Sequence, residues 1–552
     1  MCGKQFYMPK LKLLILIFIA SLAIASCARK GSITGGLKDT IPPTIIGSYP
    51  KNMSTDFSGN KIHIDFDEYI KIKDVNKQLI ISPPLKYQPT IVPSGSASKF
   101  IDITIRDTLQ PNTTYSFNFG QSITDNNEGN PYSQFRFIFS TGSYIDSLQQ
   151  AGSIKDAHDI KTDNFVTIMM YEANETFNDS TIYKERPRYV TNTLDSALVF
   201  SLQNLKAGKY HLFALKDLSN NYIYNPKSDK LAFLNKTITV PNDTVYELKL
   251  FKEIPKFKPF KPSQTSSNRL YMGYEGDYRD TKATVKNGTG TEEIKSVLTK
   301  VTDKDSLQLW LPRGLKADSL QVQVTRKDFT QDFTVKIKEM KSADSLQVDA
   351  VQKGGLHFRE NFTIKATTPL VNIDVSKISL VNKDSVAVPF TQVYDDLNQQ
   401  LVFDFKKEES EKYNFVLMPG ALTDFYGKEN DTLNYKLNTR TYGDYGNLRI
   451  NLENVKRFPV IVEITDSKGK VYASAYSEKE TQIDFDAIEP NKYVLRLIYD
   501  DNKNKEWDTG DYLQKIQPEE VIYWQGPKGP TDILIDVRSD WDVDQEFSVG
   551  GK

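Results

Sequence analysis

The sequence predicts an all-β protein made of several antiparallel β-sandwiches in tandem. Apolar residues alternate with other residues in most segments, for example in Ile101–Ile105, Tyr115–Phe119 and Leu307–Leu311. Because side chains on a strand point alternately to opposite faces, each run predicts a strand with one buried face. Turn-forming residues separate the runs about every 8–12 positions, and helical periodicity is almost absent. Many short strands of this kind favour sandwiches.

A secretory signal followed by Cys27 is the clearest functional feature. Lys4, Lys10 and Lys12 precede an apolar segment, Leu13–Ala25, and small residues lie directly before Cys27. This is the layout of a signal peptide, and a cysteine at this place resembles a bacterial lipobox. The resemblance implies cleavage after residue 26, lipidation of the Cys27 thiol and acylation of its new amine, which together anchor the chain durably. The alternatives are a non-lipidated cysteine and an uncleaved transmembrane helix, for which about 13 apolar residues are too few.

The composition excludes several classes of protein. The 552 residues contain only two cysteines, Cys2 and Cys27. Cleavage removes the first and lipidation uses the second, so the mature chain keeps no cysteine for a disulfide, a zinc site, an iron–sulfur cluster or a nucleophile. The formal charge of −1 becomes −4 without residues 1–26, which hold three lysines and no acidic residue. No basic stripe with interleaved aromatic residues occurs, which argues against nucleic-acid binding.

The chain is long enough for several domains, at about 100–150 residues each. We expect a signal peptide, a lipidated tether, five sandwiches and one linker. In order these are 1–26, 27–39, 40–143, 144–254, the linker 255–267, 268–349, 350–442 and 443–552. The tether is rich in glycine and is expected to be flexible, whereas the proline-rich linker is expected to be semi-rigid.

Two pairs of segments repeat ordered motifs. The first and fourth sandwiches share an apolar residue, threonine and aspartate before a glycine, at Ile123–Asp125 and Leu422–Asp424. In the second sandwich Tyr210 precedes Asp217 by seven positions, as Tyr493 precedes Asp500 in the fifth. The order of the sandwiches is therefore interpreted as A, B, C, A′, B′.

The first sandwich resembles the SbsA-type bacterial Ig-like domain. The matching segments are Asp39–Pro43, Tyr49–Asn52, Ile62–Glu68, Leu109–Tyr115 and Ile123–Asp125. The whole chain is similar to the Ig-like outer-membrane lipoproteins of Bacteroidota, a likeness to which Gly35–Thr40 and Pro187–Thr191 add. The resemblance implies a fold and a compartment but no catalytic residues. The expected fold class is thus tandem antiparallel Ig-like or transthyretin-like sandwiches after a lipoprotein signal peptide.

The sequence leaves the face of the outer membrane open. In such lipoproteins, an acidic patch directly after the lipidated cysteine is associated with display on the cell surface. Here Ala28–Ser32 follow Cys27, and no acidic residue occurs before Asp39. A periplasmic and a cell-surface position are therefore both retained.

The best candidate site is a segment rich in carboxylates and amides. Oxygen-bearing side chains recur within twelve residues, at Asp500, Asn502, Asn504, Asp508 and Asp511. This spacing resembles a calcium loop, in which alternate residues direct oxygens at one hard cation. It departs at Lys505, where glycine is usual, and at Asp511, where the longer glutamate is usual. The alternative is a hydrogen-bonded, Asx-rich loop between strands, without metal.

Other polar residues are weaker candidates for a functional site. The loop of the second sandwich offers one carboxylate among Asp217, Ser219, Asn221 and Asn225, which favours a plain turn. Near His63, alternation places His63, Asp65 and Asp67 on a solvated face, as in a charged strand edge, although a carboxylate pair could serve a glycosidase. The four histidines lie on separate segments without metal spacing: His63, His158, His211 and His357.

Two functions from different classes follow. The leading hypothesis is a non-enzymatic envelope lipoprotein that acts as an elongated protein-interaction module. Its expected partner is an outer-membrane β-barrel machine for secretion or barrel assembly, to which it would be an accessory subunit. The alternative is a carbohydrate-binding or adhesion lipoprotein of the cell surface, with aromatic anchors at Trp310, Trp507, Trp524 and Trp541. A hydrolase would need a polar cluster that only folding could assemble.

Overall fold

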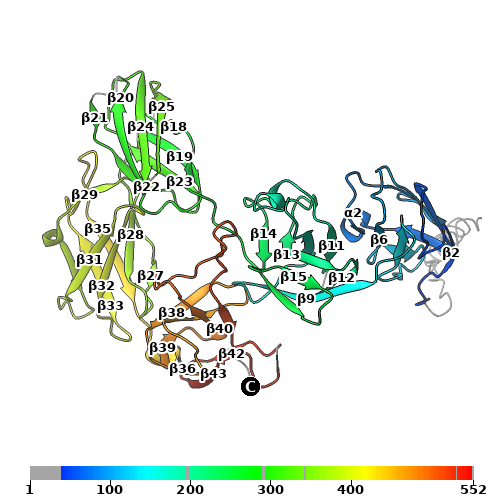
Figure 1. The fold of residues 1–552 in the computed structure, drawn as a ribbon. Coiled ribbons are helices and arrows are strands. Elements are labelled where there is room, and N and C mark those ends of the chain that lie inside the picture. The colour runs from blue at the N-terminus through cyan, green and yellow to red at the C-terminus, as the bar shows by residue number, and fades with distance from the viewer. Residues whose placement is uncertain are drawn as a thin grey trace, which may run out of the picture. The chain divides into compact units, whose positions relative to one another are not determined.

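The computed structural model describes residues 39–193, 198–288, 292–327, 329–340, 344–529 and 531–549. Strands dominate these residues (Figure 1), which confirms the all-β prediction. The helical elements found there are short: α2 (Val75–Gln78), η1 (Thr181–Tyr183), η2 (Val375–Lys377) and η3 (Tyr442–Asp444). The expected signal peptide and Cys27 lie outside the described residues. Within the described ranges, no helix is both long and apolar enough to cross a membrane.

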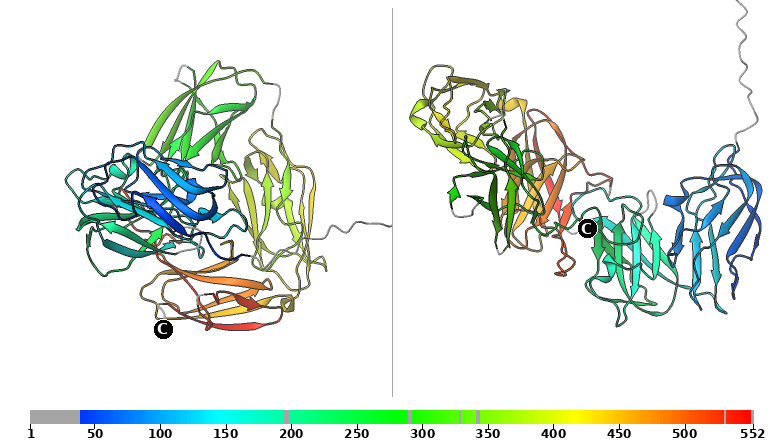
Figure 2. Two further views of the ribbon diagram at one scale, coloured as in Figure 1. Left: turned by 90° about the vertical axis from the view of Figure 1, so that its right-hand side faces the viewer. Right: turned by 90° about the horizontal axis from the view of Figure 1, so that it is seen from above.

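The contacts divide the chain into two compact units. The first holds the described residues up to Leu79, with Lys86–Asn112 and Phe117–Ser143. The second holds Ile80–Leu85, Thr113–Ser116 and the chain from Tyr144 onward. Two further views show that both units consist mainly of β-strands and contain little helix (Figure 2).

Two sheets occupy residues 45–140 and are termed the first sheet pair. Their strand orders are β1-β2-β5-β4, with β7 also paired to β2, and β3-β6-β8. The strands are β1 (Ile45–Tyr49), β2 (Lys61–Ile72), β3 (Ile80–Ser82), β4 (Thr90–Val92), β5 (Ser98–Thr104), β6 (Thr114–Asn118), β7 (Ile123–Asp125) and β8 (Arg136–Ser140). In β2, Ile62, Ile64 and Phe66 are buried and the residues between them are not, which is the predicted alternation.

The second sheet pair occupies residues 148–250. Its orders are β11-β10-β13-β14, with β15 also paired to β13, and β12-β9-β16, in which β9 and β16 are parallel. The strands are β9 (Leu148–Asp156), β10 (Thr167–Glu172), β11 (Tyr189–Asn192), β12 (Val199–Leu205), β13 (Gly208–Lys216), β14 (Lys230–Phe233), β15 (Ile238–Val240) and β16 (Tyr246–Leu250). Ile168, Leu212 and Leu248 belong to one buried core that includes strands of both sheets.

The third sheet pair occupies residues 258–336. Its orders are β17-β19-β23-β22, with β18 also paired to β19, and β21-β20-β24-β25. The strands are β17 (Lys258–Pro259), β18 (Ser263–Ser266), β19 (Arg269–Glu275), β20 (Lys282–Asn287), β21 (Glu293–Ile294), β22 (Val297–Lys300), β23 (Ser306–Trp310), β24 (Ser319–Arg326) and β25 (Phe329–Lys336). The sequence predicts a linker at 255–267, but β17 and β18 lie within it and Phe257 packs into the third core. A proline is tolerated there because β17 is a short edge strand.

The fourth sheet pair occupies residues 348–438. Its orders are β26-β28-β32-β31 and β27-β35-β33-β30, and β29 pairs with β34 beside them. The strands are β26 (Val348–Ala350), β27 (Gly354–Gly355), β28 (Phe362–Ala366), β29 (Leu370–Ile373), β30 (Ile378–Val381), β31 (Phe390–Asp395), β32 (Gln400–Phe405), β33 (Lys412–Leu417), β34 (Leu422–Asp424) and β35 (Leu433–Asn438). Phe362, Phe403 and Phe415 stack at its centre, with ring centroids 4.8–5.8 Å apart.

The fifth sheet pair occupies residues 446–548. Its orders are β39-β36-β43, in which β36 and β43 are parallel, and β38-β37-β40-β41, with β42 also paired to β40. The strands are β36 (Gly446–Glu453), β37 (Val460–Thr465), β38 (Val471–Ser477), β39 (Gln482–Ile488), β40 (Asn491–Tyr499), β41 (Val521–Tyr523), β42 (Ile535–Val537) and β43 (Asp542–Ser548). Tyr493, Leu495 and Leu497 of β40 fill its core.

The repeats seen in the sequence have counterparts in topology. In the second and fifth sheet pairs, a nine-residue strand (β13 or β40) pairs with one long and two short strands, and the other sheet contains a parallel pair. In the first and fourth, β3-β6-β8 corresponds to β30-β33-β35, and the β2–β7 pairing corresponds to β29–β34. The topology therefore supports the order A, B, C, A′, B′, while the domain boundaries stay predictions.

Within the second unit, the fifth sheet pair contacts the second sheet pair. Polar contacts join the second pair to the third, the third to the fourth, the fourth to the fifth and the fifth to the second: Lys227–Glu275, Lys300–Leu397, Arg440–Glu489 and Thr509–Lys252. The strand pattern does not predict these contacts, because alternation describes each sandwich but not the contacts between sandwiches.

Candidate functional site

The Asp500–Asp511 segment forms a tight loop that begins where β40 ends. Asp500 is buried, and its carboxylate accepts hydrogen bonds from the N–H groups of Asn504 (3.1 Å) and Lys505 (2.8 Å). Lys505 occupies the position at which calcium loops usually carry glycine. Its φ of 67° lies in the left-handed region, which glycine enters most easily. The segment therefore turns sharply at this position, with a lysine in a strained conformation.

The two asparagines of the loop direct their oxygens at the backbone. Asn502 Oδ1 accepts the N–H of Asn504 (3.0 Å), and Asn504 Oδ1 accepts the N–H of Glu506 (2.8 Å). Both amide nitrogens donate to Asp508 Oδ2, each at 2.6 Å. A calcium ion takes about six to eight oxygen ligands. To reach one ion, the asparagine oxygens would therefore have to leave the backbone donors.

Glu519 closes the loop, a role that the sequence analysis missed. Its Oε1 accepts the N–H of Asp501 (2.7 Å) and its Oε2 accepts the N–H of Asp508 (3.0 Å). Burial raises the pKa of the Glu519 carboxyl, and the neighbouring charges of Asp508 and Asp500 act in the same direction. The loop is thus held by two carboxylates, Asp500 at its start and Glu519 beyond its end.

Asp511 does not join the other predicted ligands. Its carboxylate accepts the N–H and the side-chain amide of Gln514, both at 2.9 Å, in the turn that follows. Asp500, Asn502, Asn504 and Asp508 share the hydrogen-bond network of the loop. In the part of the chain that the structure describes, no three His, Cys, Asp or Glu side chains form a group that could hold a metal. Calcium binding stays a prediction, and the geometry favours the hydrogen-bonded loop.

The loop after β13 has the same design. Asp217 is buried and accepts the N–H of Tyr222 at 2.7 Å. A second carboxylate, Asp229, accepts the N–H groups of Leu218 (3.3 Å) and Asn225 (3.0 Å). Burial raises the pKa of Asp217. This hydrogen-bonded loop agrees with the plain turn favoured from the sequence.

A signal for the second carboxylate is present in the sequence of both loops. Asp229 directly precedes β14, and Glu519 lies two positions before the first residue of β41. In each case the acidic residue follows the loop and precedes the next strand of the same sheet. A search for a paired carboxylate at that place, rather than for metal-ligand spacing, would have found it.

We expect calcium to leave the stability of the protein unchanged, because the loop oxygens already accept internal hydrogen bonds. A site with a dissociation constant of about 0.1 mM would add about 2.7 kcal/mol at about 10 mM calcium. Thermal unfolding in EDTA and in calcium measures the difference, with magnesium as the control ion. A saturable rise in melting temperature that is specific to calcium and lost in Asp508→Asn would contradict this expectation.

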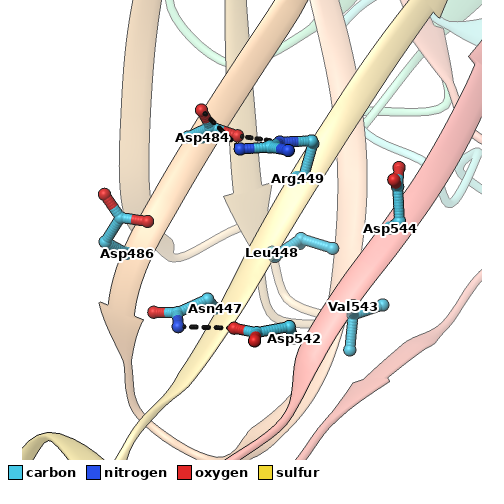
Figure 3. A pocket seen from close by; sticks show the side chains of 8 residues that line it. All are labelled: Asn447, Leu448, Arg449, Asp484, Asp486, Asp542, Val543 and Asp544. Carbon is cyan, nitrogen blue, oxygen red and sulfur yellow. Dashed lines mark hydrogen bonds and ion pairs between the residues drawn. The ribbon is translucent and has the colours of Figure 1, made fainter.

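A shallow polar groove lies on the face of β39, β36 and β43 (Figure 3). Its volume is about 300 Å³, and it is lined by Asn447, Leu448, Arg449, Asp484, Asp486, Asp542, Val543 and Asp544. Asn447 donates to Asp542 (2.7 Å) and Arg449 to Asp484 (2.7 Å), so cross-strand pairs use much of the polar lining. Four carboxylates against one guanidinium leave a negative surface that suits hydrogen-bond donors.

The aromatic anchors proposed for sugar binding are mostly unavailable. Trp310 is fully buried and donates to Thr299 (2.8 Å), and Trp524 packs in the fifth core. Trp507 packs against the ring of His158, with centroids 4.5 Å apart. Trp541 is 47% exposed. Trp310 and Trp524 are therefore corrected to packing roles, Trp507 is partly buried, and Trp541 is the most exposed of the four.

His63 forms a charged cluster on β2 and β5. Its Nδ1 lies 2.6 Å from Asp102 and its Nε2 lies 3.0 Å from Asp65, while Asp67 instead accepts hydrogen bonds from Thr44. The hydrogen bond to Asp102 raises the pKa of His63 most; burial lowers it, and Asp65 raises it further. The His63 side chain is 41% exposed, as expected for the solvated face. The arrangement is an ion-pair cluster on an outer strand surface.

We expect the pKa of His63 to lie above 6.5, as measured by an NMR titration of its ring protons. Because the folded pKa is raised, the stabilisation is fully present below the unfolded value and is lost as pH rises through the folded pKa. The effect on stability is small, since solvent screens an exposed pair. Asp102→Asn should lower this pKa more than Asp65→Asn, and an equal or reversed effect would contradict the assignment.

Comparison with known proteins gives a family match for part of the chain. Residues 39–141 match the model of a bacterial Ig-like domain. No curated protein matches the chain.

Solved structures with tandem domains are also found. Domains 1–6 of the surface layer protein SbsC share 11% identity, cover 91% of this chain and 69% of that one, and have a TM-score of 0.14. Titin domains A168–A170 share 12% identity, cover 44% and 91% of the two chains, and have a TM-score of 0.14. Extracellular domains 3–5 of Drosophila OTK share 9%, cover 54% and 93%, and have a TM-score of 0.14. At such low TM-scores these likenesses support no argument. The comparisons therefore show one thing, that residues 39–141 match a bacterial Ig-like domain within an all-β chain.

Proposed function

We propose that this chain is a non-enzymatic lipoprotein of the bacterial envelope that binds another protein. Tandem Ig-like sandwiches suggest a protein-interaction or adhesion module. Cys27, at the end of the signal sequence, supports lipid attachment at the outer membrane. The partner we propose is an outer-membrane β-barrel machine for secretion or barrel assembly, with this chain as its accessory subunit.

The observation that carries the proposal is the repeated use of two sandwich topologies. The second and fifth sheet pairs share a topology, as do the first and fourth. Repetition multiplies exposed loops and strand edges, which are the surfaces that peptide and protein partners commonly use. The buried carboxylates support a structural rather than a catalytic role, because Asp125, Asp424 and Asp500 each accept hydrogen bonds from backbone N–H groups of their own turns.

A pull-down of the tagged lipoprotein from native outer membranes in mild detergent tests the proposal. We expect mass spectrometry to find one β-barrel protein in stoichiometric amount. The matched control is Cys27→Ser, which should lose membrane attachment and co-purify with less of that partner. Recovery of the lipoprotein alone, from membranes in which it is abundant, would refute a stable subunit.

The second candidate is a carbohydrate-binding or adhesion lipoprotein of the cell surface. The observation that favours it is the exposed ring of Trp541, beside which Arg538 lies 4.9 Å from the ring centroid. An exposed indole can stack on an apolar ligand face while polar neighbours bond its hydroxyls. Glycan binding that is lost in Trp541→Ala and kept in Tyr442→Ala, which changes another exposed aromatic residue, would support this function.

A further inference from the structure

The segment between β40 and β41 contains a small hairpin that contacts the second sheet pair. Asp511 and Ile516 exchange two backbone hydrogen bonds, of 3.0 and 2.9 Å, and close the turn between them. Residues Thr509–Gln517 are termed the clasp. The clasp contacts residues that lie more than 250 positions earlier, since Thr509 donates a hydrogen bond to a carbonyl oxygen 257 positions earlier.

Tyr512 of the clasp inserts into an aromatic cluster of the second sheet pair. Its side chain is 2% exposed and belongs to the same buried cluster as Met169 and Leu231. Its ring meets those of Phe213 and Phe233 edge to face, with centroids 5.6 and 5.2 Å apart. Edge-to-face packing of this kind is specific in geometry and adds to the burial of apolar area. Tyr512 is therefore a core residue of a sheet pair to which its own strands do not belong.

Gly510 permits this close approach. A Cβ at this position would lie 2.7 Å from the ring of Phe251 and 2.9 Å from the carbonyl oxygen of Ile516. Phe251 is itself buried and bonded to Leu231 through the backbone, so it has little freedom to move. Any side chain at residue 510 would separate the clasp from the second sheet pair.

Polar contacts fix the position of the clasp. Thr509 donates to the carbonyl oxygen of Lys252 (2.8 Å), and the N–H of Tyr512 donates to Glu253 (2.6 Å), whose other oxygen accepts the hydroxyl of Tyr224 (2.7 Å).

Two further groups hold the end of the hairpin. Lys515 pairs with Asp179 at 2.6 Å and lies 3.7 Å from the centroid of the Tyr512 ring. Gln517 donates to the carbonyl oxygen of Phe233 at 3.0 Å. The contact therefore combines an aromatic anchor, a glycine without room for a side chain, and directional polar bonds, as interfaces between stable partners do.

We propose that Thr509–Gln517 is an intramolecular clasp that joins the fifth sheet pair to the second and makes the second unit one cooperative body. The third and fourth sheet pairs then lie, along the chain, between two sheet pairs that contact each other. Closing so long a loop costs conformational entropy, and the clasp contacts offset this cost. When the clasp opens, the second and fifth sheet pairs lose these contacts, while His158 still touches Trp507 and Tyr523 and contacts with the third and fourth sheet pairs remain.

Hydrogen exchange of the full mature lipoprotein in detergent tests the proposal. In Gly510→Val, we expect amides of the clasp and of β14 to exchange at least ten times faster, while β36, in the core of the fifth sheet pair, keeps its protection. Leu513→Ala is the matched control, because Leu513 lies in the same hairpin but is 53% exposed. Its exchange should equal that of the unchanged protein.

Lys515→Glu keeps the test decisive if Gly510→Val unfolds the fifth sheet pair. This variant reverses one exposed charge opposite Asp179 and leaves the core intact. Faster exchange in the clasp and β14 together, with β36 unchanged, supports the proposal. Unchanged exchange in both variants, or faster exchange in the clasp with none in β14, would overturn it.

Discussion

Replacing Arg496 by alanine is expected to destabilise the fifth sheet pair by about 3–5 kcal/mol, because it leaves a buried partner charge unpaired. The Arg496 side chain is 3% exposed and contacts Glu463 on the neighbouring strand at 2.6 Å. It also donates to the hydroxyl of Tyr523 (3.4 Å) on the other side. Val494 and Ile498 flank it on β40 and are buried on the same face. Water therefore cannot replace the guanidinium, and the Glu463 carboxylate would lose its main partner.

Denaturant unfolding of the mature chain measures this loss in the unfolding transition that includes the fifth sheet pair. The double variant Arg496→Met with Glu463→Leu should recover more than half of it, since apolar residues of similar size can replace a buried pair. Arg449→Ala is the matched control. Arg449 pairs with Asp484 at 2.7 Å in the same sheet pair, but both side chains are more than a third exposed, so its loss should cost under about 1 kcal/mol. An Arg496→Ala cost as small as that of Arg449→Ala would show that the pair is not buried in solution.

The strands could be predicted because their signal is local. In β2, Ile62, Ile64 and Phe66 alternate with polar residues, and a strand with this pattern has one buried face wherever it lies in the fold. The turn motifs were also local. Asp125 and Asp424 are the last residues of β7 and β34, and each accepts backbone N–H groups of the turn that follows. The order of the sandwiches, A, B, C, A′, B′, could be predicted from such motifs without knowledge of the contacts between sandwiches.

The candidate site could be predicted only in part, because burial between sheet pairs leaves no periodic signal. Trp310 alternates with the core leucines of β23, a pattern that places its side chain on the opposite face of the strand. It is fully buried because its outward face is covered, in part by Arg269, whose guanidinium lies 5.1 Å from the ring centroid. Tyr512 lies in a loop of mixed composition, and its partners Phe213 and Phe233 are distant in sequence. Glu519 lies beyond the twelve-residue spacing of a calcium loop, so that spacing could not identify it as the acceptor for the N–H groups of Asp501 and Asp508.

Replacing Asp424 by alanine should destabilise the fourth sheet pair by about 3 kcal/mol, the cost of several lost hydrogen bonds to a charged group. Asp424 is fully buried, and its Oδ1 accepts the N–H groups of Tyr426 (2.9 Å) and Lys428 (2.8 Å). Its Oδ2 accepts the hydroxyl of Thr368 (2.8 Å), which is also fully buried. Alanine would leave three donors without an acceptor, and each would keep its desolvation cost.

The size of the loss should follow the number of bonds that each variant removes. Asp424→Asn keeps one oxygen for the two N–H groups and can meet the Thr368 hydroxyl with its amide, so we expect it to cost about half as much as alanine. Asp431→Ala is the matched control, because this exposed carboxylate lies on the same sheet pair and its loss should cost under about 0.5 kcal/mol.

Asp125→Ala should reproduce the loss in the first sheet pair, where Glu128, Gly129 and Asn130 donate to Asp125 at 2.7–2.9 Å. Burial raises the pKa of Asp125, but these hydrogen bonds outweigh burial and lower it overall, so the stabilisation is present above the unfolded pKa and is lost as pH falls through the folded value. Thermal unfolding should be measured at several acidic pH values. As pH falls, the unchanged protein should lose the stability that Asp125 provides, whereas Asp125→Ala should not show this loss. The same pH dependence in both proteins would refute the shared turn mechanism.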